Sequence, residues 1–232
     1  MSYHIYCLNY GDKRTATITA SFAAVGLSDK VTFYSGIDVS KMKKANNYLP
    51  EVNCGMYKAW SATMGHRKMM KIFLETSDAE FGIFCENDIR LHKNIKKEIP
   101  YYLEKFQELN LEILLFGYLL TDKKTELSGK ILSNIYDINS VPGAQMYLLT
   151  RAKCEEFVKK YDINYLIASQ YHPDKYFTFP DMIFTKHGRK AAIYPMLAVE
   201  FISNDWQSWH SGPPAFGHQY TCMKNNLTND YL

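Results

Sequence analysis

The sequence predicts a single α/β domain with a mostly parallel central sheet flanked by helices. Apolar runs of strand length alternate with segments of helical periodicity along most of the 232 residues. The run LEILLFGYLL, residues 111–120, is apolar at most positions, which is typical of a strand covered by helices on both faces. No linker rich in Pro, Gly or Ser divides the chain, so we expect one domain over residues 1–232.

The first half of the chain alternates between predicted strands and predicted helices. Short apolar or β-branched runs predict strands over residues 4–10, 30–37, 80–87 and 111–120. Apolar residues at helical spacing predict helices over 14–27, 56–77 and 94–110. Gly26 marks the end of the first helix, and Pro100 is accommodated near the start of the third. Residues 41–55 show neither pattern and predict a loop.

The second half is less regular. We expect a loop over 121–140, a strand over 144–150, an amphipathic helix over 151–162, and a turn with a short helix over 179–188. A last strand over 190–201 contains Pro195, which cannot donate to a strand ladder, so we expect an edge or bulged strand. The aromatic and His-rich tail after this strand predicts a loop.

Charge and cysteine content narrow the functional classes. The chain has a formal net charge of +3 and a pI of about 8.4. This excess of positive charge is smaller than is typical of nucleic-acid-binding domains, but it is compatible with an anionic small substrate such as a nucleotide. The five cysteines show no CxxC spacing, which disfavours a zinc knuckle or redox motif and favours a reducing compartment. Cys7 and Cys85 lie inside apolar runs and are predicted core residues.

No segment of the sequence predicts export or membrane insertion. The stretch MSYHIYCLNY lacks the basic start and long apolar region of a signal peptide. No apolar run approaches the ~18 residues of a membrane-spanning helix. We therefore expect a cytoplasmic protein with no membrane span, and its high Lys, Asn and Tyr content also fits a bacterium or a virus-infected host cell.

The stretch FGIFCENDIRLHKN, residues 81–94, is the most informative. An apolar strand ends in Glu86 and Asp88, at the edge where α/β sheets bind ligands. At positions i and i+2 of an extended chain the two carboxylates can point the same way, with Asn87 facing the opposite side. Converging carboxylates would bind Mg²⁺ or Mn²⁺, which in turn could hold a diphosphate. The alternative is a strand-end turn with solvated acids.

Several colinear stretches resemble glycosyltransferase family 25, the lipooligosaccharide and collagen sugar transferases with the A-type, Rossmann-like nucleotide-sugar fold. IYCLNYGDKR resembles the family's opening Ile-Asn-Leu strand with Asp-Arg-Arg, and TMGHRKMMK resembles its Leu-Ser-His helix. FGIFCEND resembles its strand ending in Glu-Asp-Asp, and FPDMIF falls at its Pro-Val-Asp stretch. LEILLFG and GAQMYLLTRAKCEEFV resemble a later strand and the Gly-x-x-Ala-Tyr unit. The chain departs from the family at Gly65 (Ser), Asn87 (Asp) and Met146 (Ala).

The resemblance implies a metal-dependent, inverting glycosyltransferase. The expected donor is a nucleotide-diphosphate sugar, with a UDP-sugar as the favoured one. The expected acceptor is a hydroxyl group of a glycan or a protein. Residues 1–120 would form the nucleotide-sugar-binding half and residues 121–232 the acceptor-binding half with a C-terminal loop. The metal, Mn²⁺ or Mg²⁺, would be held by Glu86, Asp88 and His210, because a late His followed by Gly completes the metal shell in several A-type transferases.

Four further residues receive roles from the same resemblance. Asn9 and Arg14 would contact the donor nucleotide, Arg14 through a phosphate; alternatively, Asp12 caps the next helix and Arg14 lies on the surface. His66, in the position of the family's His, is a candidate for donor or phosphate contact, or a structural residue of its helix. Asp181 would be the general base that deprotonates the acceptor hydroxyl, or the cap of a short helix.

Two other functions remain open from the sequence. A nucleotidyltransferase also uses strand-end carboxylates and a metal, but it releases pyrophosphate, whereas a glycosyltransferase releases a nucleoside diphosphate. A degenerate, non-catalytic transferase domain would bind sugars without metal or turnover, and Asn87 in the acidic triad is the best argument for it. The absence of GxGxxG and P-loop motifs disfavours dinucleotide- and ATP-loop enzymes.

Overall fold

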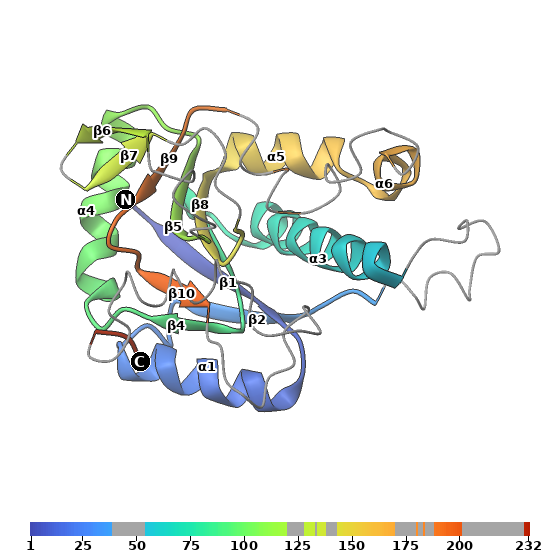
Figure 1. Ribbon diagram of the computed structural model, residues 1–232, viewed down its shortest axis with the longest axis horizontal. Coiled ribbons are helices and arrows are strands. Elements are labelled where there is room, and N and C mark those ends of the chain that lie inside the picture. Colours follow the sequence, from blue (N-terminus) through green and yellow to red (C-terminus); the bar gives the residue numbers. More distant parts are fainter. Residues whose placement is uncertain are drawn as a thin grey trace.

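The computed structural model describes residues 1–38, 54–119, 128–132, 134–137, 143–169, 188–200 and 230–232, together with positions 180 and 183. Within these residues, helices cover both faces of an eight-stranded sheet, and a two-stranded sheet lies beside it (Figure 1). The prediction of an α/β domain is therefore confirmed. Strands from both halves of the chain pair within the large sheet.

The large sheet has the strand order β2-β1-β3-β8-β5-β9-β7-β6. The strands are β1 Tyr3–Asn9, β2 Val31–Ser35, β3 Phe81–Glu86, β5 Ile113–Gly117, β6 Ser128–Leu132, β7 Ile135–Asp137, β8 Met146–Thr150 and β9 Lys190–Ile193. β1 is parallel to β2 and β3, and β5 is parallel to β9, while β8 lies antiparallel between β3 and β5. Because β8 is antiparallel to both neighbours, β3 and β5 run in the same direction, and the predicted, largely parallel sheet is confirmed.

Two apolar cores lie on opposite faces of the sheet. α1 (Asp12–Ala24) and α4 (Ile95–Glu108) contribute to one core, and α3 (Cys54–Thr76) and α5 (Arg151–Lys160) to the other. A short α6 (Ile163–Ser169) follows α5. Successive side chains of β1 point to opposite faces of the sheet and so enter different cores. Ile5 and Cys7 belong to the first core, and Tyr6 and Leu8 to the second. Cys85 is buried beside Cys7, as predicted.

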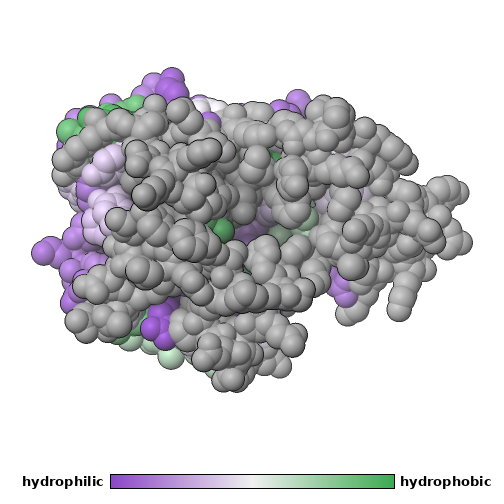
Figure 2. Space-filling view, in the orientation of Figure 1, coloured by the Kyte–Doolittle hydropathy of each residue, from purple (hydrophilic) through white to green (hydrophobic). Residues whose placement is uncertain are grey.

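Helix α4 illustrates how the sequence selects its buried face. The apolar residues recur at helical spacing and are all buried: Ile95, Ile99, Tyr102, Leu103 and Phe106. Its charged residues face outward, and hydrophilic surface is visible on the α4 side of the molecule (Figure 2). Pro100 lies inside the helix, as the sequence predicts.

Helix α3 is held closely against the sheet and at its C-terminal end. A Cβ atom on Gly65 would lie 2.8 Å from Cδ2 of Leu8, so glycine permits the approach of α3 to β1. At the other end, the guanidinium of Arg151 donates to the carbonyl oxygens of Leu74, Ser77 and Ala79 over 2.9, 2.7 and 3.3 Å. The carbonyl of Leu74 is among the last four of α3, which lack intrahelical partners, while those of Ser77 and Ala79 belong to the connection from α3 to β3.

Three sequence predictions differ from the structure. Part of the segment 121–140 forms the β6–β7 hairpin, so the prediction of a loop there is wrong. The predicted last strand is two strands, β9 in the large sheet and β10 (Ala198–Glu200) in the small one. β9 is also an interior strand between β5 and β7, because the chain leaves the sheet before Pro195, which has no N–H for a ladder. The loop and short helix predicted over 41–55 and 179–188 lie largely outside the described residues.

The small sheet brings the C-terminal residues next to the end of β3. β4 (Ile89–Leu91) pairs antiparallel with β10, and His92 forms an isolated bridge with Tyr231. The backbone N–H of Leu232 donates to the carbonyl of Leu91 over 2.9 Å. None of the helices in the described part of the chain combines the length and apolar character that crossing a bilayer requires.

Candidate active site

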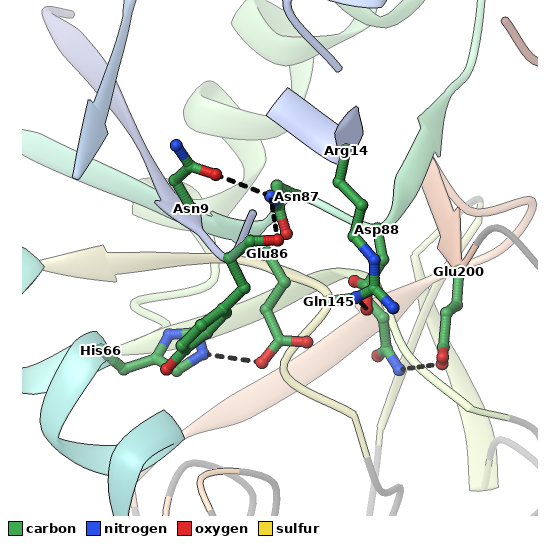
Figure 3. Close-up of polar contacts among 9 residues, drawn as sticks. Asn9, Arg14, His66, Glu86, Asn87, Asp88, Gln145 and Glu200 are labelled. Carbon is green, nitrogen blue, oxygen red and sulfur yellow. Dashed lines mark hydrogen bonds and ion pairs between the residues drawn. The ribbon is translucent and has the colours of Figure 1, made fainter. Parts of the chain in front are cut away.

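Polar side chains gather where β1 and β3 end. The register pairs Leu8 of β1 with Glu86 of β3, so the carboxyl ends of two parallel strands lie side by side. The residue before the antiparallel β8, Gln145, accepts a hydrogen bond of 3.1 Å from the backbone N–H of Glu86. Ligands of open α/β sheets bind at such an edge. The predicted site residues placed here are Asn9, Arg14, His66, Glu86 and Asp88 (Figure 3).

Glu86 is held from within the protein by His66 of α3. The Nε2 atom of His66 lies 3.1 Å from Oε1 of Glu86, and its Nδ1 atom lies 2.8 Å from the hydroxyl of Tyr147 on β8. His66 is 0% exposed, whereas the Glu86 side chain is 28% exposed. Burial lowers the pKa of His66 to about 3, so the ring is neutral at pH 7. The structure therefore places His66 behind Glu86, away from solvent.

Asp88 is held from the opposite side of the site by Arg14. The Nη1 atom of Arg14 lies 3.1 Å from Oδ2 of Asp88, and the side chains are 27% and 20% exposed. Arg14 lies in the first turn of α1, where Gly11 takes the N-cap position without a side-chain hydrogen bond. Gly11, rather than Asp12, is therefore the N-cap residue of α1. The positive end of the helix dipole adds to the charge of Arg14 at this point.

Asn87 points away from the open edge and ties β3 to β1. Its side chain is 2% exposed, and Nδ2 donates to Oδ1 of Asn9 over 2.9 Å and to the carbonyl of Tyr10 over 3.3 Å. Oδ1 of Asn9 also accepts from the hydroxyl of Thr15. The amide at position 87 is a hydrogen-bond donor to two acceptors, a role that a carboxylate could not fill. The difference from the Asp of glycosyltransferase family 25, which the sequence resembles, therefore has a structural reason.

Tyr10 lies next to the two carboxylates. Its hydroxyl donates to the carbonyl of Ser61 over 3.1 Å. Burial raises the pKa of this phenol, and the negative charges of Glu86 and Asp88 raise it further, so it stays protonated at neutral pH. The ring lies beside Gly36, where a side chain would collide with it. Sequence reasoning assigned no role to Tyr10, although it follows Asn9 directly at the end of β1.

A third carboxylate reaches the site from β10. Nε2 of Gln145 donates to Oε2 of Glu200 over 3.5 Å, and the strand register places Glu200 opposite Ile89, the residue after Asp88 (Figure 3). Gln145 is almost fully buried. Glu200 was not predicted as part of the site. The available signal was that AVE, like FGIFCE, is an apolar run that ends in a glutamate.

The two predicted metal ligands at the end of β3 contact different helices in this structure. β3 ends at Glu86 and residues 87–88 form a bend, so the alternation of an extended strand no longer fixes the direction of Asp88. Glu86 turns to α3 and Asp88 to α1. Among the side chains that the structure describes, no three His, Cys, Asp or Glu residues form a group that could hold a metal ion. Asp181 and His210 lie outside the described residues.

Comparisons with known proteins add similarities of fold. No family model and no curated protein matches the chain, so the resemblance to glycosyltransferase family 25 stays a prediction. A glycosyltransferase involved in glycosylation of the major capsid of PBCV-1 has a TM-score of 0.47 at 11% identity, covering 96% of this chain and 100% of that one. Mannose-1-phosphate geranyltransferase from Thermus thermophilus has a TM-score of 0.45 at 9% identity, covering 83% and 74%. Mouse xyloside xylosyltransferase 1 has a TM-score of 0.41 at 12% identity, covering 80% and 79%. Similarities of this strength assign no function to the chain.

Proposed function

We propose that this protein is a glycosyltransferase that moves a hexose or pentose from a nucleotide-diphosphate sugar, a UDP-sugar, to a glycan or protein hydroxyl with inversion. The observation that carries the proposal is the placement of Glu86, Asp88 and Arg14 at the end of β3. Carboxylates beside a guanidinium and a helix N-terminus suit a diphosphate that arrives with a divalent cation. The colinear resemblance of the sequence to family 25 supports the same assignment.

The donor chemistry of the edge fits a divalent cation. Glu86 and Asp88 supply hard carboxylate oxygens, and both side chains are partly exposed. They would hold Mn²⁺ or Mg²⁺, with His210 as the proposed third protein ligand. When bound, the cation would neutralise the charge that develops on the leaving diphosphate.

Arg14 would bind a phosphate of the donor. In the structure its guanidinium pairs with Asp88, so arrival of a cation and a diphosphate would replace one ion pair by two. Asp88 would turn to the cation and Arg14 to a phosphate oxygen, and neither charge would be left without a counter-charge. Asn9 and Asn87 would keep the end of β1 fixed beside β3 during this exchange.

The transfer also requires a base that activates the acceptor hydroxyl. Asp181, the proposed general base, would accept the proton of the acceptor hydroxyl as its oxygen attacks the anomeric carbon. The bond between the anomeric carbon and the diphosphate oxygen would break, and its electron pair would leave with the nucleoside diphosphate. Attack opposite the leaving group inverts the configuration.

Product analysis tests the proposal. We expect incubation of the protein with UDP-sugars, Mn²⁺ and candidate glycan acceptors to release UDP, and Asp88→Asn to reduce the rate by roughly 100-fold or more. Release of pyrophosphate would instead identify a nucleotidyltransferase. Sugar binding with no metal dependence and no released nucleotide would identify a non-catalytic domain.

A further inference from the structure

Tyr147 and His66 form a hydrogen-bonded chain that ends on Glu86. We propose that these two residues are positioning residues, which fix the carboxylate of Glu86 for the cation; this inference rests on the proposed function. The chain joins three elements: β8 supplies Tyr147, α3 supplies His66 and β3 supplies Glu86 (Figure 3 shows the last two).

The hydrogen bonds of this chain have a defined direction. A carboxylate has only acceptor oxygens, so the ring N–H of His66 is on Nε2 and donates to Oε1 of Glu86 over 3.1 Å. In the neutral ring the other nitrogen, Nδ1, is an acceptor, and the hydroxyl of Tyr147 donates to it over 2.8 Å. One tautomer of His66 therefore satisfies both contacts. A buried ring with both nitrogens engaged is held in one orientation.

Packing fixes the first two members of the chain. Tyr147 and His66 are both 0% exposed. The ring of Tyr147 stacks on Phe84 with 5.6 Å between centroids, and the strand register pairs the same two residues. His66 lies on the long helix α3, which Arg151 holds at its C-terminal end. Neither side chain can therefore move far without opening the core.

Glu86 is consequently oriented before any ligand arrives. Its backbone N–H is bound to the carbonyl of Gln145, and its carboxylate is bound to His66. The ring N–H of His66 holds this carboxylate by one oxygen, Oε1, from the side of α3. Asp88 differs, because its partner Arg14 is a cation and competes with a metal ion. The geometry thus assigns Glu86 as the fixed ligand and Asp88 as the exchangeable one.

Variants that keep the packing separate positioning from general stability. Tyr147→Phe removes only the hydroxyl and retains the ring that stacks on Phe84. His66→Leu removes both hydrogen bonds, whereas His66→Gln retains an N–H at the end of the side chain that can reach Glu86. Met70→Leu, another buried position on α3, is the matched control for a change in the core.

The test is the affinity of folded protein for Mn²⁺, titrated with and without UDP by calorimetry. We expect His66→Leu to weaken Mn²⁺ binding by about 10–100-fold and Tyr147→Phe to weaken it less, because loss of a group that orients a metal ligand has effects of this size. His66→Gln should recover most of the affinity, and Met70→Leu should match the wild type.

Two results would overturn the inference in different ways. If His66→Leu and Tyr147→Phe are folded and bind Mn²⁺ as the wild type does, the positioning role is wrong and the proposed function stands. If the wild type binds no Mn²⁺ with any nucleotide, the proposed function fails and the role for Glu86 fails with it. The ¹⁵N chemical shifts of the His66 ring give an independent readout. A proton on Nδ1 in place of Nε2 would contradict the hydrogen bonds that link Tyr147, His66 and Glu86.

Discussion

The guanidinium of Arg14 lies 3.1 Å from the carboxylate of Asp88 and joins the first turn of α1 to the bend after β3. Both side chains are partly exposed, so water screens the pair, and its contribution to stability is at most about 1 kcal/mol. Its larger consequence is for binding, because Arg14 and a cation compete for the same carboxylate.

Arg14→Ala should therefore have opposite effects on two ligands. Mn²⁺ alone should bind more tightly, because its competitor for Asp88 is gone. A UDP-sugar with Mn²⁺ should bind roughly 10-fold or more weakly, because hydrogen bonds between charged groups contribute about 1.5–3 kcal/mol. Calorimetric titration measures both affinities. Lys71→Ala, which removes an exposed cation paired with Glu75, is the control and should change neither. Weaker binding of Mn²⁺ alone to Arg14→Ala would contradict the competition.

Asn87→Asp should destabilise the protein at neutral pH by roughly 1–3 kcal/mol. The new carboxylate would face two acceptor oxygens, those of Asn9 and Tyr10, in a buried site. Such an environment raises the pKa of the introduced carboxyl above the unfolded value of about 3.9. The carboxyl of the folded variant then binds a proton more tightly than the same carboxyl in the unfolded chain. The loss of unfolding free energy relative to the wild type should therefore grow as the pH rises and shrink near pH 4. Urea unfolding of the variant and the wild type at several pH values measures this loss of stability. A loss that does not change with pH would argue against the buried hydrogen bonds of Asn87.

His66 should make stability depend on pH in the acidic range. Burial lowers the pKa of its ring to about 3 in the folded protein, against about 6.5 in an unfolded chain. Between these values the unfolded chain binds the extra proton. Stability is therefore fully present above about pH 6.5 and is lost as the pH falls, by up to about 1.4 kcal/mol per pH unit.

The comparison that isolates this effect is wild type against His66→Gln, which does not titrate. The difference in unfolding free energy between the two proteins should shrink from about pH 7.5 to pH 5, because the wild type alone must release a proton to fold. Parallel stability curves for the two proteins over this range would show that the ring is already exposed or already charged.

Arg151 should be among the most important cations for stability in the described part of the chain. Its guanidinium donates to the carbonyl oxygen of Leu74 in the last turn of α3 and to two carbonyl oxygens of the connection to β3, and it lies 4.9 Å from the ring of Phe73. We expect Arg151→Ala to reduce the free energy of unfolding by roughly 2–3 kcal/mol. Arg151→Lys should restore only part of it, because an ammonium lacks the planar fork. Chemical denaturation measures both, and Lys159→Ala on the exposed side of α5 should have little effect. If Arg151→Lys has the same free energy of unfolding as the wild type, the positive charge at this position stabilises the protein and the planar guanidinium does not, which would contradict the prediction.

The sequence predicted the elements with regular periodicity and the edge of the sheet where the site lies. Runs such as residues 81–86 and 146–150 are apolar on both faces, and both are buried strands. Pro195 marked an irregularity in the predicted strand over 190–201, but the sequence did not show that the piece after it joins a second sheet, because both pieces are apolar and each one's partners are distant along the chain. The hairpin β6–β7 was missed because its strands are short and the segment around them, residues 121–140, is mostly polar.

Within the site, local pattern identified residues but not their partners. Glu86 and Asp88 were recognisable at the end of an apolar strand. The contact of His66 with Tyr147 joins residues 81 positions apart, and that of Gln145 with Glu200 joins residues 55 apart, so neither is encoded in local spacing. The role of Asn87 was likewise hidden, because its acceptors lie on β1. Long-range packing decides whether a polar residue faces the ligand or supports a neighbour.

Thermal unfolding against a panel of nucleotides and nucleotide sugars, with and without Mn²⁺, is the most direct test that this edge is a nucleotide-sugar site. A ligand that binds only the folded protein raises the melting temperature by mass action. We expect a UDP species with Mn²⁺, at 100-fold over its Kd, to raise it by roughly 5–10 °C, and we expect Asp88→Ala to abolish the shift. No shift with any nucleotide, or a shift that is independent of both Mn²⁺ and Asp88, would contradict the proposed donor site.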